Sequence, residues 1–86
     1  MFDFKKREDM SEQYGDLLFA DGFDDAILGI VERCGFDAVV CYDVEKILEI
    51  LMKDDMSYED AIEYYEFNIL GAYVGEKTPM FLEKWV

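Results

Sequence analysis

Residues 43–53 carry the helix signal that most constrains how this chain can fold. Asp43 is a good N-cap residue, and the residues behind it are good helix formers. Apolar side chains then recur at i, i+3, i+4 and i+7, at Val44, Ile47, Leu48 and Leu51. This spacing predicts an amphipathic helix to about Lys53, with one apolar face that needs a core to cover it.

A second helix signal follows at once. Ser57 begins a pattern that resembles a capping box, which predicts a helix from about Tyr58 to Leu70, ended by Gly71 as a C′ residue. Its expected inner stripe is Tyr58, Ala61, Ile62, Tyr65 and Ile69. Its expected outer stripe, at i, i+4 and i+7, consists of Glu59, Glu63 and Glu66.

Short apolar runs flank these helices. Residues 26–31 and 38–42, joined by a glycine-containing loop, predict a β-hairpin, although the first run also fits a helix. Residues 72–74 predict a third strand, and 80–82 either extend it or return to the sheet. The order ββααβ predicts a small α+β domain with an antiparallel sheet packed on two helices.

The chain is short enough for one domain over residues 1–86. Residues 1–20 are the least determined part, and we expect either a flexible or a separately packed segment. The spacing of Tyr14, Leu17 and Leu18 favours a short helix within residues 11–20, which Gly15 weakens.

Charge limits the choice of partner. The chain has 21 Asp and Glu against 8 Lys and Arg, a formal net charge of −13, and no basic residue interrupts 8–32 or 54–76. Such a chain repels nucleic acid and anionic membranes and attracts basic surfaces. No apolar run approaches the roughly 18 residues of a membrane span, and residues 1–10 lack a signal-peptide core. We therefore expect a basic protein surface as the partner, without direct nucleic-acid or membrane binding.

Catalytic and metal chemistry find little support. The chain has no His, and its only serines are Ser11 and Ser57, so nucleophilic catalysis lacks a base. Cys34 and Cys41 match no zinc spacing and are expected to be reduced thiols, buried as small apolar groups. The stretch 21–32 lacks the glycine of a calcium loop. We expect no enzyme activity, no cofactor and no metal.

The acidic residues themselves are the candidate binding site. The outer stripe of the second predicted helix has no Lys or Arg on its face, and like charges at i, i+4 destabilise a helix, so a solubilising role alone explains it poorly. Carboxylates repeated along a helix resemble in scale the phosphates of one DNA strand. The candidate partner-binding residues are Asp54, Asp55, Glu59, Asp60, Glu63, Glu66, Asp21, Asp24 and Asp25.

Residues 64–79, YYEFNILGAYVGEKTP, form the most distinctive run. It resembles a segment of small acidic bacteriophage-encoded hypothetical proteins with the pattern E-F-N-x-x-G-A-(Y/W)-V-G-E-x-T-P. The resemblance covers about residues 23–82 and implies a phage origin and a place in the host bacterial cytoplasm. Together with the charge, it favours an inhibitor of a bacterial defence or host nucleic-acid-binding protein, as a DNA mimic of the anti-CRISPR or anti-restriction type. The alternative is a non-enzymatic accessory or structural phage protein that self-associates, as a homodimer, through its aromatic surface.

Overall fold

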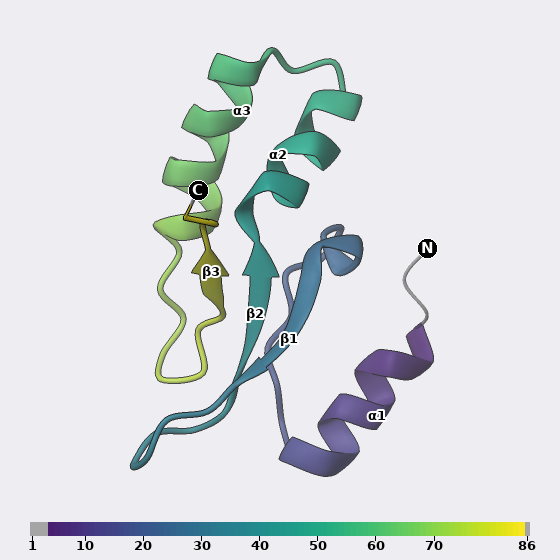
Figure 1. Cartoon of the computed structure of the whole chain (residues 1–86), viewed down its shortest axis with the longest axis vertical. Helices are drawn as coiled ribbons and strands as arrows, with labels where there is room; N and C mark the ends of the chain where they lie inside the picture. The colour runs from purple at the N-terminus through teal and green to yellow at the C-terminus, as the bar shows by residue number, and fades with distance from the viewer. Residues whose placement is uncertain (1–3, 86) are drawn as a thin grey trace.

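The chain folds into a small α+β structure with a mixed sheet. The structure is a computed structural model. It describes residues 4–85, with side chains described from Arg7 to Trp85. Its elements are α1 (Phe4–Tyr14), the 3-10 turn η1 (Asp24–Ala26), β1 (Ile27–Val31), β2 (Val39–Asp43), α2 (Val44–Lys53), α3 (Tyr58–Tyr64), the π-helix η2 (Tyr65–Leu70) and β3 (Met80–Leu82) (Figure 1). The predicted α+β class is correct, and the predicted order ββααβ lacks the N-terminal helix.

The predicted hairpin is present. β1 and β2 pair antiparallel, with Ile30 opposite Val40 and Val31 opposite Val39, and the register shifts between Ile27 and Gly29. The first apolar run is therefore a strand, and the helical alternative is wrong for it. The strand follows from its β-branched residues, which pack well on a pleated surface.

The third strand confirms the predicted alternative in which residues 80–82 return to the sheet, but its direction differs from the antiparallel prediction. It is formed by residues 80–82 and pairs parallel to β2, with Cys41 opposite Met80 and Asp43 opposite Leu82. Residues 72–74 lie in an exposed loop. The cause is the path of the chain: α2 continues the direction of β2, α3 returns, and the loop after η2 turns again, so β3 runs alongside β2 (Figure 1). The sheet is mixed rather than antiparallel.

Both predicted helix starts are confirmed. The side chain of Asp43 accepts a hydrogen bond from the N–H of Glu45 at 3.1 Å, and the hydroxyl of Ser57 accepts one from the N–H of Asp60 at 3.1 Å. These bonds satisfy N–H groups that a helix start leaves free. The predicted inner stripe of the second helix is wrong at one position, since Tyr58 is 57% exposed.

The second helix changes geometry before it ends. From Tyr65 it continues as a π-helix, and the N–H of Gly71 donates to the carbonyl of Glu66 at 3.1 Å. The helical segment ends at Gly71 as predicted, but Gly71 is the C-cap residue with φ −77° and not the left-handed residue common at C′. Glycine is needed there for another reason: a Cβ at this position would lie 3.1 Å from the Glu66 carbonyl oxygen and 3.2 Å from that of Phe67.

The N-terminal helix lies earlier than predicted, at Phe4–Tyr14 instead of within 11–20. It ends at Gly15, whose N–H bonds to the carbonyl of Ser11 at 2.8 Å and whose φ of +83° suits glycine. Leu17, Phe19 and Ala20 then pack against the main core. The start of the uncertain N-terminal segment, residues 1–3, lies outside the described residues.

The core lies between the sheet and the helical segments that pack against it, namely η1, α2, α3 and η2. Its largest fully buried side chains are Tyr42, Ile47 and Val40. Phe81 of β3 stacks on Tyr42 at 5.9 Å between ring centroids and meets the edge of Tyr65 at 5.7 Å. This aromatic contact ties the sheet to η2, and such pairs contribute beyond their buried area.

Candidate protein-binding surface

The acidic face of the molecule lies at the end where α2 turns into α3. We use this name for Asp54, Asp55, Glu59, Asp60, Glu63 and Glu66, all of which are exposed. The turn forms where α2 ends, with the N–H of Asp54 bonded to the carbonyl of Leu51 at 3.0 Å. Asp55 takes a left-handed φ of 67°, which short polar side chains tolerate. Local turn and helix signals therefore place these carboxylates in solvent together.

Among the described side chains, these six carboxylates have no counter-ion. The ion pairs among the described residues involve Arg7, Lys46 and Lys84, and none reaches the acidic face. Lys53, in the last turn of α2, is the nearest basic residue in the sequence and forms no ion pair with a described residue. The negative charge of this face is left for solvent or a partner.

The three-residue ladder that the sequence predicts is shorter in the structure. Glu59 and Glu63 lie within α3 and keep the i, i+4 spacing of an α-helix. Glu66 lies within η2, where the wider turn changes the angle between successive side chains. The regular i, i+4, i+7 stripe is therefore wrong beyond Glu63, although Glu66 remains exposed.

The other candidate acids lie around η1 and differ among themselves. The side chain of Asp24 is only 14% exposed and is hydrogen-bonded to a guanidinium nitrogen of Arg7. Asp21 is 99% exposed, with its carboxylate 3.8 Å from Arg7. Asp25 is exposed and has an interaction of its own. Asp24 thus contributes to the fold, and none of these three residues lines the pocket that Asp60 and Glu63 line.

Arg7 is the centre of this N-terminal group. Its guanidinium lies 4.6 Å from the centroid of the Phe19 ring, a cation–π contact. The hydrogen bond that Arg7 donates to the Asp24 carboxylate raises the pKa of Arg7, against the opposing effect of its burial. This side chain links α1 to η1 across residues 7–24 of the sequence.

A shallow pocket of about 440 Å³ adjoins the acidic face. The pocket is lined by Asp60 and Glu63 together with Met56, Tyr64 and Phe67. These apolar neighbours were not among the binding residues predicted from the sequence, although an aromatic fraction of 16% is a general signal for interface aromatics such as Tyr64 and Phe67. Phe67 is 74% exposed, so this surface combines carboxylates with accessible aromatic area.

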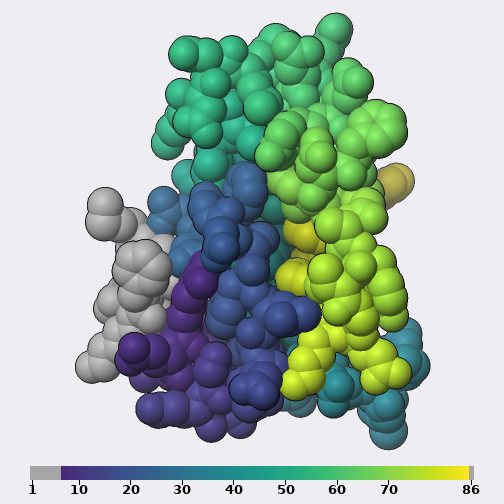
Figure 2. All heavy atoms as spheres, turned by 180° about the vertical axis from the view of Figure 1, so that it is seen from behind, coloured from purple at the N-terminus to yellow at the C-terminus, as the bar shows by residue number. Residues whose placement is uncertain are grey.

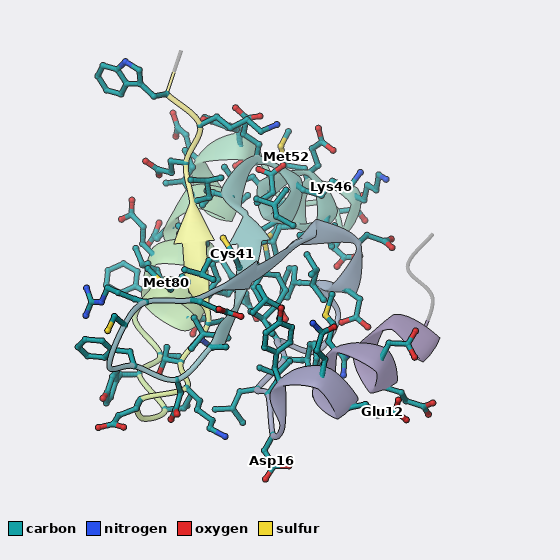
Figure 3. All side chains as sticks on the ribbon, turned by 60° about the horizontal axis from the view of Figure 1, so that its bottom comes forward. Glu12, Asp16, Cys41, Lys46, Met52 and Met80 are labelled. Carbon is teal, nitrogen blue, oxygen red and sulfur yellow. The ribbon has the colours of Figure 1, made fainter. Side chains whose placement is uncertain are left out.

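The described residues offer little for metal or thiol chemistry. Within residues 4–85 no three His, Cys, Asp or Glu side chains come together as a metal site. The predicted burial of both cysteines is wrong: Cys34 is exposed in the hairpin loop and Cys41 is half-buried. Burial raises the pKa of the Cys41 thiol, and Asp43 adds to this effect. Figure 3 shows Cys41 and Met80 close together on the open face of the sheet.

No helix in the described part of the chain is both long and apolar enough to cross a membrane. No protein-family model matches the sequence, and it matches no curated protein and no solved structure.

Proposed function

We propose that this protein acts by binding, and that its acidic face contacts a basic surface on another protein. The proposed partner is a bacterial defence protein or a host nucleic-acid-binding protein, which a phage-encoded chain would inhibit in the cytoplasm of the infected cell. The inhibitor would occupy the site that the partner uses for DNA.

One observation carries this proposal: six exposed carboxylates share one end of the molecule without an ion pair to any described residue. Such a face produces a strong negative potential and steers basic partners toward it. Glu59 and Glu63 also repel each other along α3, which costs the helix stability. A partner's basic side chains would relieve that repulsion.

The sequence supports the phage and mimic parts of the proposal. The segment 64–79 that resembles small phage-encoded proteins forms η2 and the loop after it, next to the acidic face. Within α3, one helical turn of about 5.4 Å separates successive carboxylates, which is comparable in scale with the phosphates of one DNA strand. A basic groove that binds DNA would accept this spacing.

The test combines charge reversal with competition by DNA. The wild-type chain is used to capture proteins from a bacterial lysate, and captured proteins are then challenged with duplex DNA and with added salt. We expect a basic nucleic-acid-binding partner that DNA displaces and that salt weakens. The double variant Glu59→Lys with Glu63→Lys should lose this capture.

The matched control is Glu8→Lys with Glu12→Lys on α1. Both residues are exposed, have the same i, i+4 spacing and change the net charge equally, but they lie at the opposite end of the molecule (Figure 1). The control should bind as the wild type does. If the two double variants behave alike, net charge rather than the acidic face governs capture, and the proposal fails.

Exposed aromatic side chains favour self-association as a second candidate function. Phe67, Tyr73 and Trp85 are 74%, 76% and 99% exposed. Aromatic residues are enriched at interfaces between proteins. Sedimentation of the purified chain over a range of concentrations tests this: a monomer at all concentrations contradicts the second candidate and leaves the first in place.

A further inference from the structure

A groove lined mainly by apolar side chains lies behind the sheet, beside the acidic face. One wall is the segment 18–23, and the other comes from α3, η2 and the loop that follows, while Phe81 of β3 contributes to the lining between them. Figure 2 shows it as a hollow between the blue atoms of the first wall and the green atoms of the second, with yellow C-terminal atoms inside. Its volume is about 400 Å³, within the range of ligand-binding clefts.

Hydrogen bonds hold the walls of this groove in place. The N–H of Ala20 donates to the hydroxyl of Tyr42 at 2.6 Å, which fixes the N-terminal wall to the sheet. The N–H of Val74 donates to the hydroxyl of Thr78 at 2.9 Å, which shapes the opposite loop. The ammonium of Lys77 donates to the carbonyl of Asp16 at 2.8 Å and joins the two walls. A preformed groove costs little ordering entropy when it is filled.

Apolar side chains in the groove remain uncovered by the chain itself. Leu18, Tyr64 and Val74 all line it and are 40%, 41% and 59% exposed. The groove also continues toward the acidic face, since Tyr64 and Asn68 line both it and the pocket that holds Asp60 and Glu63. An apolar cleft and a carboxylate cluster therefore form one continuous surface.

We propose that this groove is the anchor pocket for an aromatic side chain of a basic partner segment. The lysines or arginines of that segment would contact Asp60 and Glu63, and Asp21 on the other wall, while the aromatic side chain fills the apolar cleft. This inference rests on the proposed function and adds to it the kind of segment that is recognised.

The charge around the groove selects this occupant. Asp21, Asp60 and Glu63 lie on it or beside it, and the first is 99% exposed. A second copy of a chain with net charge −13 would bring like charge to that rim, and an anionic lipid surface would be repelled in the same way. A basic segment with an aromatic residue matches both the rim and the cleft, and aromatic anchors in pockets commonly dominate binding.

The test uses two synthetic peptides of equal length and charge. Both alternate lysine and serine, and they differ in a central residue, tryptophan in one and alanine in the other. Titrations are followed by the amide chemical shifts of the protein. We expect the tryptophan peptide to bind at least about tenfold more tightly, as burial of one large apolar side chain provides. It should shift the amide signals of Ile69 and Ala72.

A variant that fills the groove supplies the decisive comparison. Ala72 lines the groove and is exposed, so Ala72→Trp adds bulk there without disturbing the core. In this variant the two peptides should bind equally. Cys34→Trp places the same side chain in the exposed hairpin loop, away from the groove, and should retain the tryptophan preference. Circular dichroism confirms that both variants fold.

The outcomes separate this inference from the function on which it rests. Glu59→Lys with Glu63→Lys should weaken both peptides by a common factor and keep their ratio. If the ratio survives without that weakening, the acidic-face proposal and the proposed contact with Glu63 both fail, and the aromatic anchor in the groove stands alone. If both peptides bind the wild type equally, or if the preference survives Ala72→Trp, the groove proposal is overturned. It is also overturned if Ala72→Trp changes only the self-association of the chain.

Discussion

The two ends of the molecule carry carboxylates in opposite circumstances. At the N-terminal end, Arg7 binds the half-buried Asp24 and lies over Phe19, so a carboxylate there helps to hold α1 and η1 together. At the other end, where α2 turns into α3, the acidic face has no counter-ion among the described residues. The difference shows that, among the described residues, the fold pairs a carboxylate with a cation at one end and leaves the exposed carboxylates of the other end unpaired.

The two ends are also attached to the core by different forces. α2 and α3 are held by apolar packing, with Ile47 fully buried and Ala61 fully buried beside it in the same cluster. The N-terminal segment combines apolar contacts of Phe19 and Phe23 with the ion pair of Arg7. Substitutions that remove one of these forces at a time therefore test whether the two ends differ in this way.

The largest effect on the free energy of unfolding is expected at the end formed by α2 and α3. Ile47→Ala should reduce the free energy of unfolding by about 2–5 kcal/mol, because it removes a fully buried side chain and leaves a cavity. Leu48→Ala, at the half-buried neighbouring position, should cost less. Urea titration measures both. A larger loss for Leu48→Ala would show that the apolar face of α2 is rotated from the one described.

At the N-terminal end the expected loss is smaller. Asp24→Asn and Arg7→Met should each lower the free energy of unfolding by about 1.5–3 kcal/mol, the range for hydrogen bonds to charged groups. Together they should cost less than the sum of the two, because each removes the same interaction. If the two losses add fully, Arg7 and Asp24 contribute independently, and the ion pair between them does not hold this end.

The parts of the fold that the sequence predicted are those with local signals. The side chains of Asp43 and Ser57 cap helices within three residues of themselves, so their roles are readable without knowledge of the rest of the fold. The hairpin likewise joins neighbouring runs. The π geometry of η2 has no such signal in residues 65–70, and the contact of Tyr65 with Phe81 joins residues far apart in the sequence.

Several of the missed features depend on contacts between residues far apart in the sequence. Residues 72–74 and 80–82 are both apolar, and only the direction imposed by α2 and α3 decides which run pairs with β2. Asp24 and Arg7 are 17 residues apart, so their pairing could not be read from spacing. The exposed acids of α3 were predicted correctly in place, because helix periodicity sets them. The apolar groove was not predicted, because its walls come from residues 18–23 and 64–81, which are far apart in the sequence.

One buried tyrosine near each end, Tyr42 and Tyr65, predicts how the stability of the fold changes at high pH. Burial raises the pKa of Tyr42, whose hydroxyl accepts from Ala20 at the N-terminal end, and burial also raises the pKa of Tyr65, beside the acidic end. A raised pKa in the folded state stabilises the fold below the unfolded value of about 10 and loses that contribution as pH rises through the folded value. We therefore expect the melting temperature to fall above about pH 10.

Tyr65→Phe separates the two contributions to this alkaline loss. The Tyr65 hydroxyl forms no hydrogen bond with a described residue, so the substitution removes the titrating group at little other cost. The alkaline fall should become shallower and persist through Tyr42. An unchanged fall would assign it to Tyr42 alone, and no fall in the wild type would contradict both pKa directions.

The smallest expected effect is that of salt, and it bears most directly on the acidic face. Screening shortens the range of exposed charges from about 30 Å at 0.01 M to about 8 Å at 0.15 M, while partly buried pairs such as Arg7 and Asp24 are screened less. Relief of about 0.5 kcal/mol of repulsion would raise the melting temperature by about 2–4 °C in a domain of this size. Glu59→Lys with Glu63→Lys should flatten this rise. Glu8→Lys with Glu12→Lys should flatten it less, because those acids follow the basic run Lys5–Arg7 in the sequence. If salt instead lowers the melting temperature of the wild type, its few ion pairs outweigh the repulsion, and the unneutralised face on which the proposed function depends does not exist.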